Sequence, residues 1–178
     1  MPPGSGERRF WIAAGLWLAA IYVSAYQARA VAEALRARGL LSAAVATAFA
    51  VAACLILVWA ARSRPAAATF AILALAAGAL ALCLRRIPSP EEKIHFIEYG
   101  VLAGLLRAAM ARLPPWVRAA AAIVLTALAG LGDETIQRYL PNRVFDWRDV
   151  AVNATAGALV VVTAELLDRV GRRGRAGT

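Results

Sequence analysis

The polar residues best suited to acid–base chemistry or ligand binding lie in one short stretch, residues 133–149. It reads DETIQRYLPNRVFDWRD and holds four carboxylates, three arginines and a glutamine. Carboxylates act as general acids and bases, and a guanidinium binds phosphate or carboxylate groups through two parallel hydrogen bonds. The flanking segments, AAAAIVLTALAGLG and VAVNATAGALVVVTA, are almost entirely apolar. So much charge between two such segments indicates the polar mouth of a membrane-embedded site.

A second polar group lies upstream, in EEKIHFIEYGVLAGLL. At about 100° per residue, His95, Glu98 and Tyr99 share one face of a helix. His95 is the only histidine in the chain, and a histidine can exchange protons near neutral pH. The simpler alternative is a histidine that only reaches toward lipid headgroups. Gly100 and Gly104 lie on roughly the opposite face, where small residues let another helix approach closely.

The elements that must position these residues are apolar segments of membrane-spanning length. Hydrophobic residues make up 61% of the 178 residues, with a mean hydropathy of +0.62. A helix needs about 20 apolar residues to cross a hydrocarbon core of roughly 30 Å, and backbone groups in lipid require helices. Six segments qualify: Phe10 to about Tyr26, Leu41 to Ala61, Ala66 to Leu84, about Ile94 to Ala111, Trp116 to about Gly132, and about Asp149 to Leu167. The sequence predicts an all-α polytopic transmembrane helical bundle of about six helices.

The first segment has two interpretations. It resembles a signal peptide, with Arg8 and Arg9 before an apolar run and a cleavage site at Ala28-Arg29-Ala30. Cleavage there would leave five helices. The run is slightly long for a signal peptide, so we favour an uncleaved helix. Residues 28–40 are predicted to form a short interfacial helix whose charged face is solvated.

Charge distribution indicates the topology. The net charge is +9, and the arginines lie between the apolar segments and at both ends, where headgroups and topology explain them. We therefore expect no nucleic-acid partner. Eleven Lys and Arg lie on the side of the two termini and nine on the other side, which favours cytoplasmic termini. Residues 1–88 then hold three helices without a motif, residues 89–168 hold the site, and residues 169–178 form a basic cytoplasmic tail.

An even number of passes brings three helix ends to one membrane surface. These are the start of the fourth segment, the end of the fifth and the start of the sixth. In the sixth segment Asp146, Asp149, Asn153 and Gly157 lie within about 80° of one another on a helical wheel. Asn153 sits a full turn deeper than Asp149, where an unbonded amide costs free energy. We therefore expect Asn153 to hydrogen-bond across helices.

These motifs together resemble the VanZ-like family of bacterial membrane proteins over roughly residues 90 to 165. The family's H-x-x-x-Y falls here on His95 and Tyr99, its D-E-x-x-Q begins at Asp133, and its P-x-R ends at Arg143. Its D-x-x-D falls on Asp146 and Asp149, and its Asn and Gly fall on Asn153 and Gly157, which form an N-x-x-x-G here. One position departs from the pattern. The family's lysine stands three residues before the histidine, whereas this chain has Glu92 there and its lysine, Lys93, one residue later. The resemblance implies a protein of the bacterial inner membrane, in a family named after a protein of teicoplanin resistance.

Three functions follow as hypotheses. In the first, the site binds an anionic or lipid-linked envelope ligand, such as a cell-wall precursor or a phospholipid headgroup. In the second, the protein is a membrane-embedded enzyme acting on such a ligand. In the third, the polar residues only join helices and the protein acts through partners. Interhelical polar bonds add only about 0.6 kcal/mol each, which makes the third hypothesis the weakest.

The predicted roles divide the polar residues into two sets. Catalytic roles are predicted for His95, Glu134 and Asp149, with the histidine as general acid or base. Substrate-binding roles are predicted for Tyr99, Asp133, Gln137, Arg143, Asp146 and Asn153, with Arg143 holding the anionic group. No metal or other cofactor is expected, because the sequence contains no D-D-x-x-D or H-E-x-x-H spacing. The oligomeric state stays open.

Overall fold

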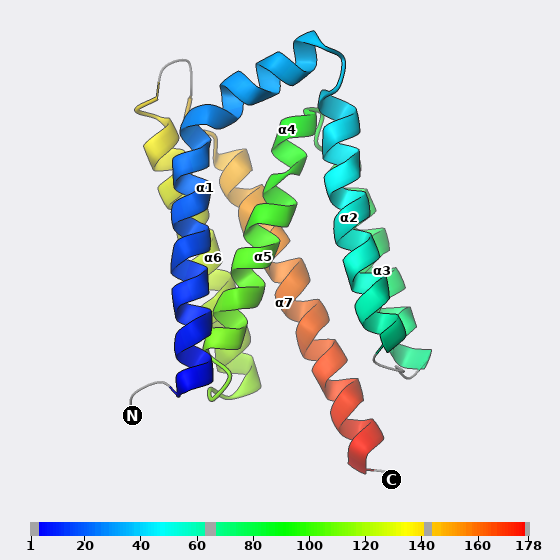
Figure 1. Cartoon of the computed structure of the whole chain (residues 1–178). Coiled ribbons are helices and arrows are strands. Elements are labelled where there is room, and N and C mark those ends of the chain that lie inside the picture. The colour runs from blue at the N-terminus through cyan, green and yellow to red at the C-terminus, as the bar shows by residue number, and fades with distance from the viewer. Residues whose placement is uncertain (1–3, 63–66, 141–143, 177–178) are drawn as a thin grey trace.

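The computed structural model describes residues 4–62, 67–140 and 144–176, and these residues form helices and no strand. The helices are α1 (Ser5–Ala37), α2 (Leu41–Arg62), α3 (Ala67–Arg85), α4 (Pro90–Lys93), α5 (His95–Ala109), α6 (Pro115–Gln137) and α7 (Trp147–Ala176). They run up and down the bundle, so that α1 begins and α7 ends at the same end of the molecule (Figure 1). The predicted all-α transmembrane bundle is confirmed.

The surface of the bundle is apolar and part of its interior is polar, which is the reverse of a soluble protein. Large side chains such as Leu16, Val23, Leu57 and Leu75 are exposed, whereas several acids, amides and an arginine are buried. The described helices α1, α2, α3, α6 and α7 are each long and apolar enough to cross a membrane. This distribution fits lipid around the bundle and polar contacts inside it.

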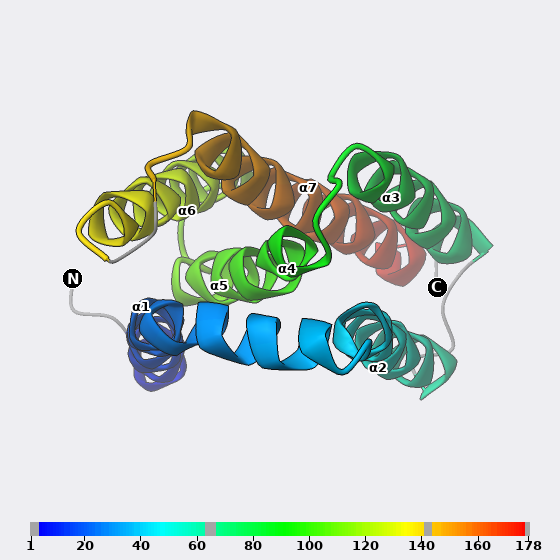
Figure 2. The same ribbon diagram turned by 90° about the horizontal axis from the view of Figure 1, so that it is seen from above.

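The short helix α5 forms the centre of the bundle. Its 15 residues span about 22 Å, and α4 precedes it with a break at Ile94. Tyr99, Leu102 and Ala103 on α5 are almost completely buried. α1, α6 and α7 pack around α5, while α2 and α3 stand to one side, α3 against α7 (Figure 2). The predicted fourth segment is therefore a helix enclosed by protein.

The structure corrects the prediction of a separate interfacial helix at residues 28–40. The first apolar segment and this polar stretch form one helix, α1, whose last turns run across the end of the bundle toward α2 (Figures 1 and 2). The helix ends because Gly39 adopts a φ of 69°, a left-handed conformation that glycine adopts without a steric cost. The amide of Leu40 then donates to the carbonyl of Leu35.

Small residues allow α7 to pack closely against its neighbours. A Cβ added at Gly100 would stand 3.1 Å from Cγ2 of Val160, so the glycine face of α5 faces α7 as its spacing suggested. A Cβ at Gly157 would stand 2.8 Å from Cγ2 of Thr126 on α6, which is too close for an undisturbed contact. Glycine at this position therefore sets the distance between α6 and α7.

Candidate functional site

Two side-chain contacts join the polar ends of α5, α6 and α7. The Tyr99 hydroxyl donates to Oδ2 of Asp133 over 2.9 Å, which links α5 to α6. Nδ1 of His95 lies 3.1 Å from Oδ1 of Asn153 and links α5 to α7. The structure thus brings together the three helix ends that the sequence placed at one membrane surface.

His95 is held in a defined orientation. Its ring stacks on Tyr99 with a centroid distance of 5.9 Å and an interplanar angle of 1°. As the Asn153 amide is oriented in the structure, its oxygen accepts from Nδ1, so a neutral ring carries its proton there. Nε2 is then the unprotonated nitrogen of the neutral ring. Asn153 itself is fully buried, and its predicted hydrogen bond across helices is confirmed.

Glu134 holds the beginning of α7. Its side chain is buried, and Oε2 accepts the backbone N–H of Asp146 over 3.0 Å. Asp146 is exposed, and its Oδ1 accepts the backbone N–H of Arg148 over 2.8 Å. The first N–H groups of a helix have no partner within the helix. These two carboxylates therefore act on the backbone at the start of α7.

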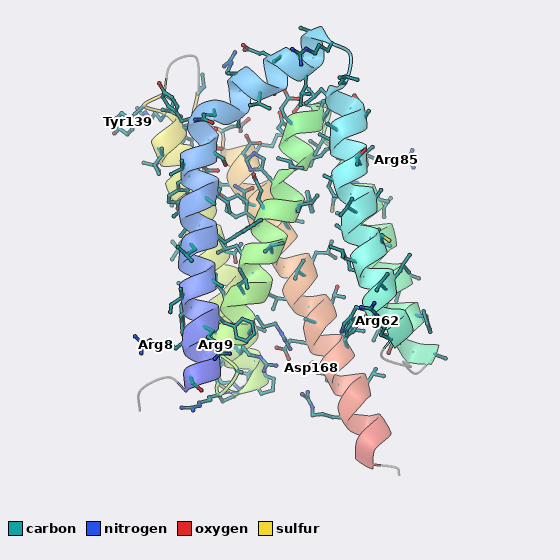
Figure 3. The ribbon with its side chains drawn as sticks, in the orientation of Figure 1. Arg8, Arg9, Arg62, Arg85, Tyr139 and Asp168 are labelled. Atoms are coloured by element: carbon teal, nitrogen blue, oxygen red, sulfur yellow. The ribbon has the colours of Figure 1, made fainter. Side chains whose placement is uncertain are left out.

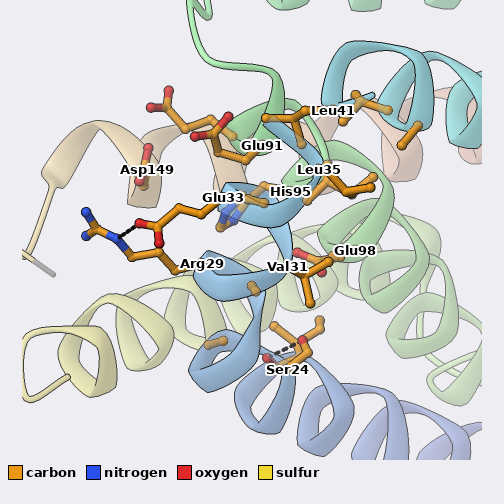
Figure 4. Close-up of a pocket in the computed structure, with 18 of the residues that line it drawn as sticks. Ser24, Arg29, Val31, Glu33, Leu35, Leu41, Glu91, His95, Glu98 and Asp149 are labelled. Carbon is orange, nitrogen blue, oxygen red and sulfur yellow. Dashed lines mark hydrogen bonds and ion pairs between the residues drawn. The ribbon is translucent and has the colours of Figure 1, made fainter. Parts of the chain in front are cut away.

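A cavity of about 490 Å³ opens beside these contacts, below the last turns of α1 (Figure 4). Of the residues predicted for the site, His95, Asp133, Gln137 and Asp149 line it. Four predicted site residues are not part of its lining. Three of them, Tyr99, Glu134 and Asn153, are buried behind it, and the fourth is Asp146. Arg143 lies outside the residues that the structure describes, as do Pro141 and Asn142.

The acidic residues that close the cavity were not predicted as a site. Glu91, Glu92 and Glu98 line it from α4 and α5, and Glu33 lines it from α1. Glu33 pairs with Arg29 over 3.0 Å, and Arg36 pairs with Glu91 (Figure 4 shows the first pair). The near-helical spacing of the α1 charges was visible in the sequence. The sequence alone indicates a solvated face, because nothing local shows that α1 turns across the bundle.

Lys93 and Glu92 lie on different sides of α4. Glu92 lines the large cavity, whereas Lys93 lines a smaller apolar space with residues of α2 and α3. The Ser89 hydroxyl accepts the backbone N–H of Glu92 and so caps α4. At the position where the resemblance expects a lysine, this chain thus places a carboxylate against the cavity.

The cavity has more negative than positive side chains. Among the described residues that line it, six are carboxylates, namely Glu33, Glu91, Glu92, Glu98, Asp133 and Asp149, and two are arginines. Oδ1 of Asp133 is buried and has no hydrogen-bond partner within the described structure, and the same is true of Oε2 of Glu91. No group of three or more His, Cys, Asp or Glu is placed to hold a metal ion within the described ranges.

A second polar cluster, also missed from the sequence, lies toward the other end of the bundle. Arg118 on α6 donates from Nε and Nη2 to the two oxygens of Glu165 on α7, each over 2.8 Å. Arg107 on α5 donates to Glu165 over 3.0 Å and to Asp168 over 2.5 Å. Figure 3 places Asp168 toward the end that carries Arg8 and Arg9, away from Tyr139. At this end of the bundle, ion pairs thus join α5, α6 and α7. At the opposite end, the same three helices line the cavity.

An apolar bundle with a polar interior and spanning helices defines a multi-pass integral membrane protein. A family model described as VanZ/LLP1 matches residues 10–168, so the chain belongs to the VanZ/LLP1 family. The match includes α1, α2 and α3, which carry none of the motifs that suggested the family. Comparisons with curated proteins and with solved structures gave no match.

Proposed function

We propose that this VanZ/LLP1 protein binds the headgroup of an envelope lipid or lipid-linked precursor in the cavity below α1. The observation that carries the proposal is Asp133, a residue of the cavity lining whose buried Oδ1 has no hydrogen-bond partner among the described residues. A buried charged group without a partner is costly. A bound ligand that donates a hydrogen bond would satisfy it.

The walls of the cavity suit an amphiphilic ligand. The α1 wall contributes apolar residues such as Ile21, Val31 and Leu35 together with the Arg29–Glu33 pair, while α4, α5, α6 and α7 contribute the other carboxylates, His95 and Gln137. Ligand pockets typically have volumes of about 300–1,000 Å³ and combine apolar walls with a few polar groups. The cavity lies at the end of the helices, where the headgroup of a lipid would be.

The orientation of the protein is part of the proposal. The basic tail after α7 and the charge bias favour cytoplasmic termini in the bacterial inner membrane. Because α1 begins and α7 ends opposite the cavity (Figure 1), the cavity would open on the outer face. Cell-wall precursors and outer-leaflet lipids are present there. A change in teicoplanin susceptibility is the cellular effect that the family name leads us to expect.

Lipid analysis of purified protein tests the binding proposal. Wild-type protein is expected to retain an envelope lipid through purification, and Asp133→Asn is expected to lose most of it because the amide removes the charge at similar volume. Asp168→Asn is the matched control, since it makes the same change at the other end of the bundle. Equal lipid retention by wild type and both variants would contradict binding in this cavity.

The orientation of His95 favours a second candidate, a membrane-embedded enzyme. The hydrogen bond of Nδ1 to Asn153 leaves Nε2 as the basic nitrogen of the neutral ring, and His95 lines the cavity. A histidine in this state can accept a proton from a bound hydroxyl or water. His95→Gln distinguishes the two candidates. If the variant retains the lipid but no longer converts it to the product found with wild-type protein, the enzyme is supported. If the variant retains the lipid in the same chemical form as wild-type protein, binding alone is supported.

A further inference from the structure

We propose that the cavity selects a ligand carrying a primary ammonium group, such as the amine of a lipid headgroup, over an anionic one. This inference rests on the proposed function and names the chemical class of the ligand. It departs from the expectation of an anionic ligand, which depended on Arg143.

Charge is the first argument. Six carboxylates and two arginines line the cavity among the described residues. Both arginines already have carboxylate partners, Arg29 with Glu33 and Arg36 with Glu91. The remaining carboxylates of the lining are Glu92, Glu98, Asp133 and Asp149, from α4, α5, α6 and α7. None of them forms an ion pair with an arginine in the described structure; the charge of Arg148 acts on its neighbour Asp149, while its guanidinium donates to the carbonyl of Arg86. An anion placed among these carboxylates would be repelled, whereas a cation would be attracted.

The unpartnered oxygen of Asp133 is the second and independent argument. The side chain is 1% exposed, and Oδ2 is already occupied by the Tyr99 hydroxyl over 2.9 Å. The Tyr99 hydroxyl holds one oxygen of the carboxylate in place, and the other, Oδ1, is buried without a hydrogen-bond partner in a residue that lines the cavity. The group is therefore prepared to accept one further hydrogen bond. Bonds from charged donors to carboxylates are the strong ones.

A primary ammonium matches this arrangement better than the other cations. It carries three N–H donors on a compact charge, and carboxylates of α1, α4, α5 and α7 line the same space as Asp133. A quaternary ammonium has no donor for Oδ1. A metal ion needs several ligands around one point, and the described carboxylates are not grouped in that way. The apolar residues of α1 would lie along the carbon chain of the amine.

Titration with defined lipids tests the inference. Purified, delipidated full-length protein in detergent is titrated with phosphatidylethanolamine, its N-acetylated form and phosphatidylglycerol, and binding is read by native mass spectrometry. We expect phosphatidylethanolamine to bind about tenfold or more tightly than the N-acetylated form, which keeps the phosphate but loses the charge. Asp133→Asn should remove this preference, and Asp168→Asn should keep it. Asp149→Asn serves as a second test should Asp133→Asn fold poorly.

Each outcome separates this inference from the proposed function. The three lipids could bind equally, or phosphatidylglycerol could bind best, with binding still reduced by Asp133→Asn. Either result overturns the ammonium inference and leaves headgroup binding intact. No binding of any of the lipids overturns both. Free ethanolamine is added as a competitor to identify the source of the amine. If millimolar ethanolamine displaces phosphatidylethanolamine, the cavity recognises an ammonium group on a soluble amine. This result supports the ammonium inference and contradicts lipid binding as the proposed function.

Discussion

Asn153 is the residue on which the internal order of the site depends most. It is fully buried on α7, its oxygen meets Nδ1 of His95 on α5, and its Cβ lies beside Gly130 on α6. A single amide thus contacts the other two helices of the site. The sequence predicted that it needs a partner, because an amide one turn below the membrane surface is costly without one. The identity of the partner required the packing of α5 against α7.

Asn153→Ala should loosen this contact without preventing insertion. We expect a loss of about 0.6–1.7 kcal/mol in the free energy of unfolding, the range of interhelical hydrogen bonds in membranes. His95 loses its fixed orientation, so ligand retention should also fall. Thr155→Ala, on the exposed face of the same helix, is the control. Unfolding in SDS followed by circular dichroism gives the free energy, and equal stability of the two variants would contradict the assigned contact.

Glu134 was predicted to be catalytic, and its geometry permits a test of that role. Its Oε2 accepts the backbone N–H of Asp146, a contact that a glutamine oxygen can also make. Glu134→Gln should therefore keep ligand binding and stability near the wild-type level, while Glu134→Ala should lower both. Loss of function in the glutamine variant, with normal insertion and stability, would show that the charge itself is needed and would restore a chemical role.

Length and apolar composition predicted six membrane segments, and a helix of the structure lies in each of them. Five of these helices are long and apolar enough to cross a membrane, whereas α5 has only 15 residues, and α1 and α7 extend well beyond the predicted segments. α6 continues past its apolar run to Gln137 and so carries Asp133 and Glu134 on a helix. The continuation of α1 could not be read from the sequence, because its polar stretch interrupts the apolar run just where a span should end. The ion pairs of Arg107 and Arg118 were missed for a related reason. Their carboxylates lie about 50–60 residues further along the chain, and only packing brings them together.

The contact between α6 and α7 depends on Gly157. Gly157→Ala places a Cβ against Thr126, and we expect a loss of about 1–3 kcal/mol from overpacking. The double variant Gly157→Ala with Thr126→Ala should recover most of this loss because it removes the group in the way. Gly78→Ala on α3, where a Cβ would meet nothing within 4 Å, should not lower stability, because alanine favours a helix more than glycine does. Failure of the double variant to recover stability in SDS unfolding would contradict the contact.

At the scale of the whole molecule, the two ends of the bundle differ in structure. One end holds an acidic cavity below α1, and the other holds ion pairs that join α5, α6 and α7. The sequence placed the polar mouth at the end opposite the termini, and the structure has the same arrangement. Which end faces the cytoplasm is a matter of membrane topology, and it decides whether outer-leaflet ligands can enter.

Cysteine labelling tests the orientation. In a background where Cys54 and Cys83 are replaced by alanine, Tyr139→Cys marks the cavity end and Arg8→Cys marks the other (Figure 3). We expect a membrane-impermeant maleimide to label Tyr139→Cys in spheroplasts and to label Arg8→Cys only after permeabilisation. Both positions are exposed. The reverse pattern would place the cavity on the cytoplasmic side.

Charged side chains of α1, α5, α6 and α7 line one binding space at a single membrane surface. The most direct test of this shared space is the amount of lipid retained per protein by four purified variants, one from each wall: Glu33→Gln on α1, Glu98→Gln on α5, Asp133→Asn on α6 and Asp149→Asn on α7. Every one of these variants is expected to lose part of the same lipid, whereas Asp168→Asn at the far end is expected to retain it. Loss confined to a single helix, or equal loss in Asp168→Asn, would contradict a shared cavity.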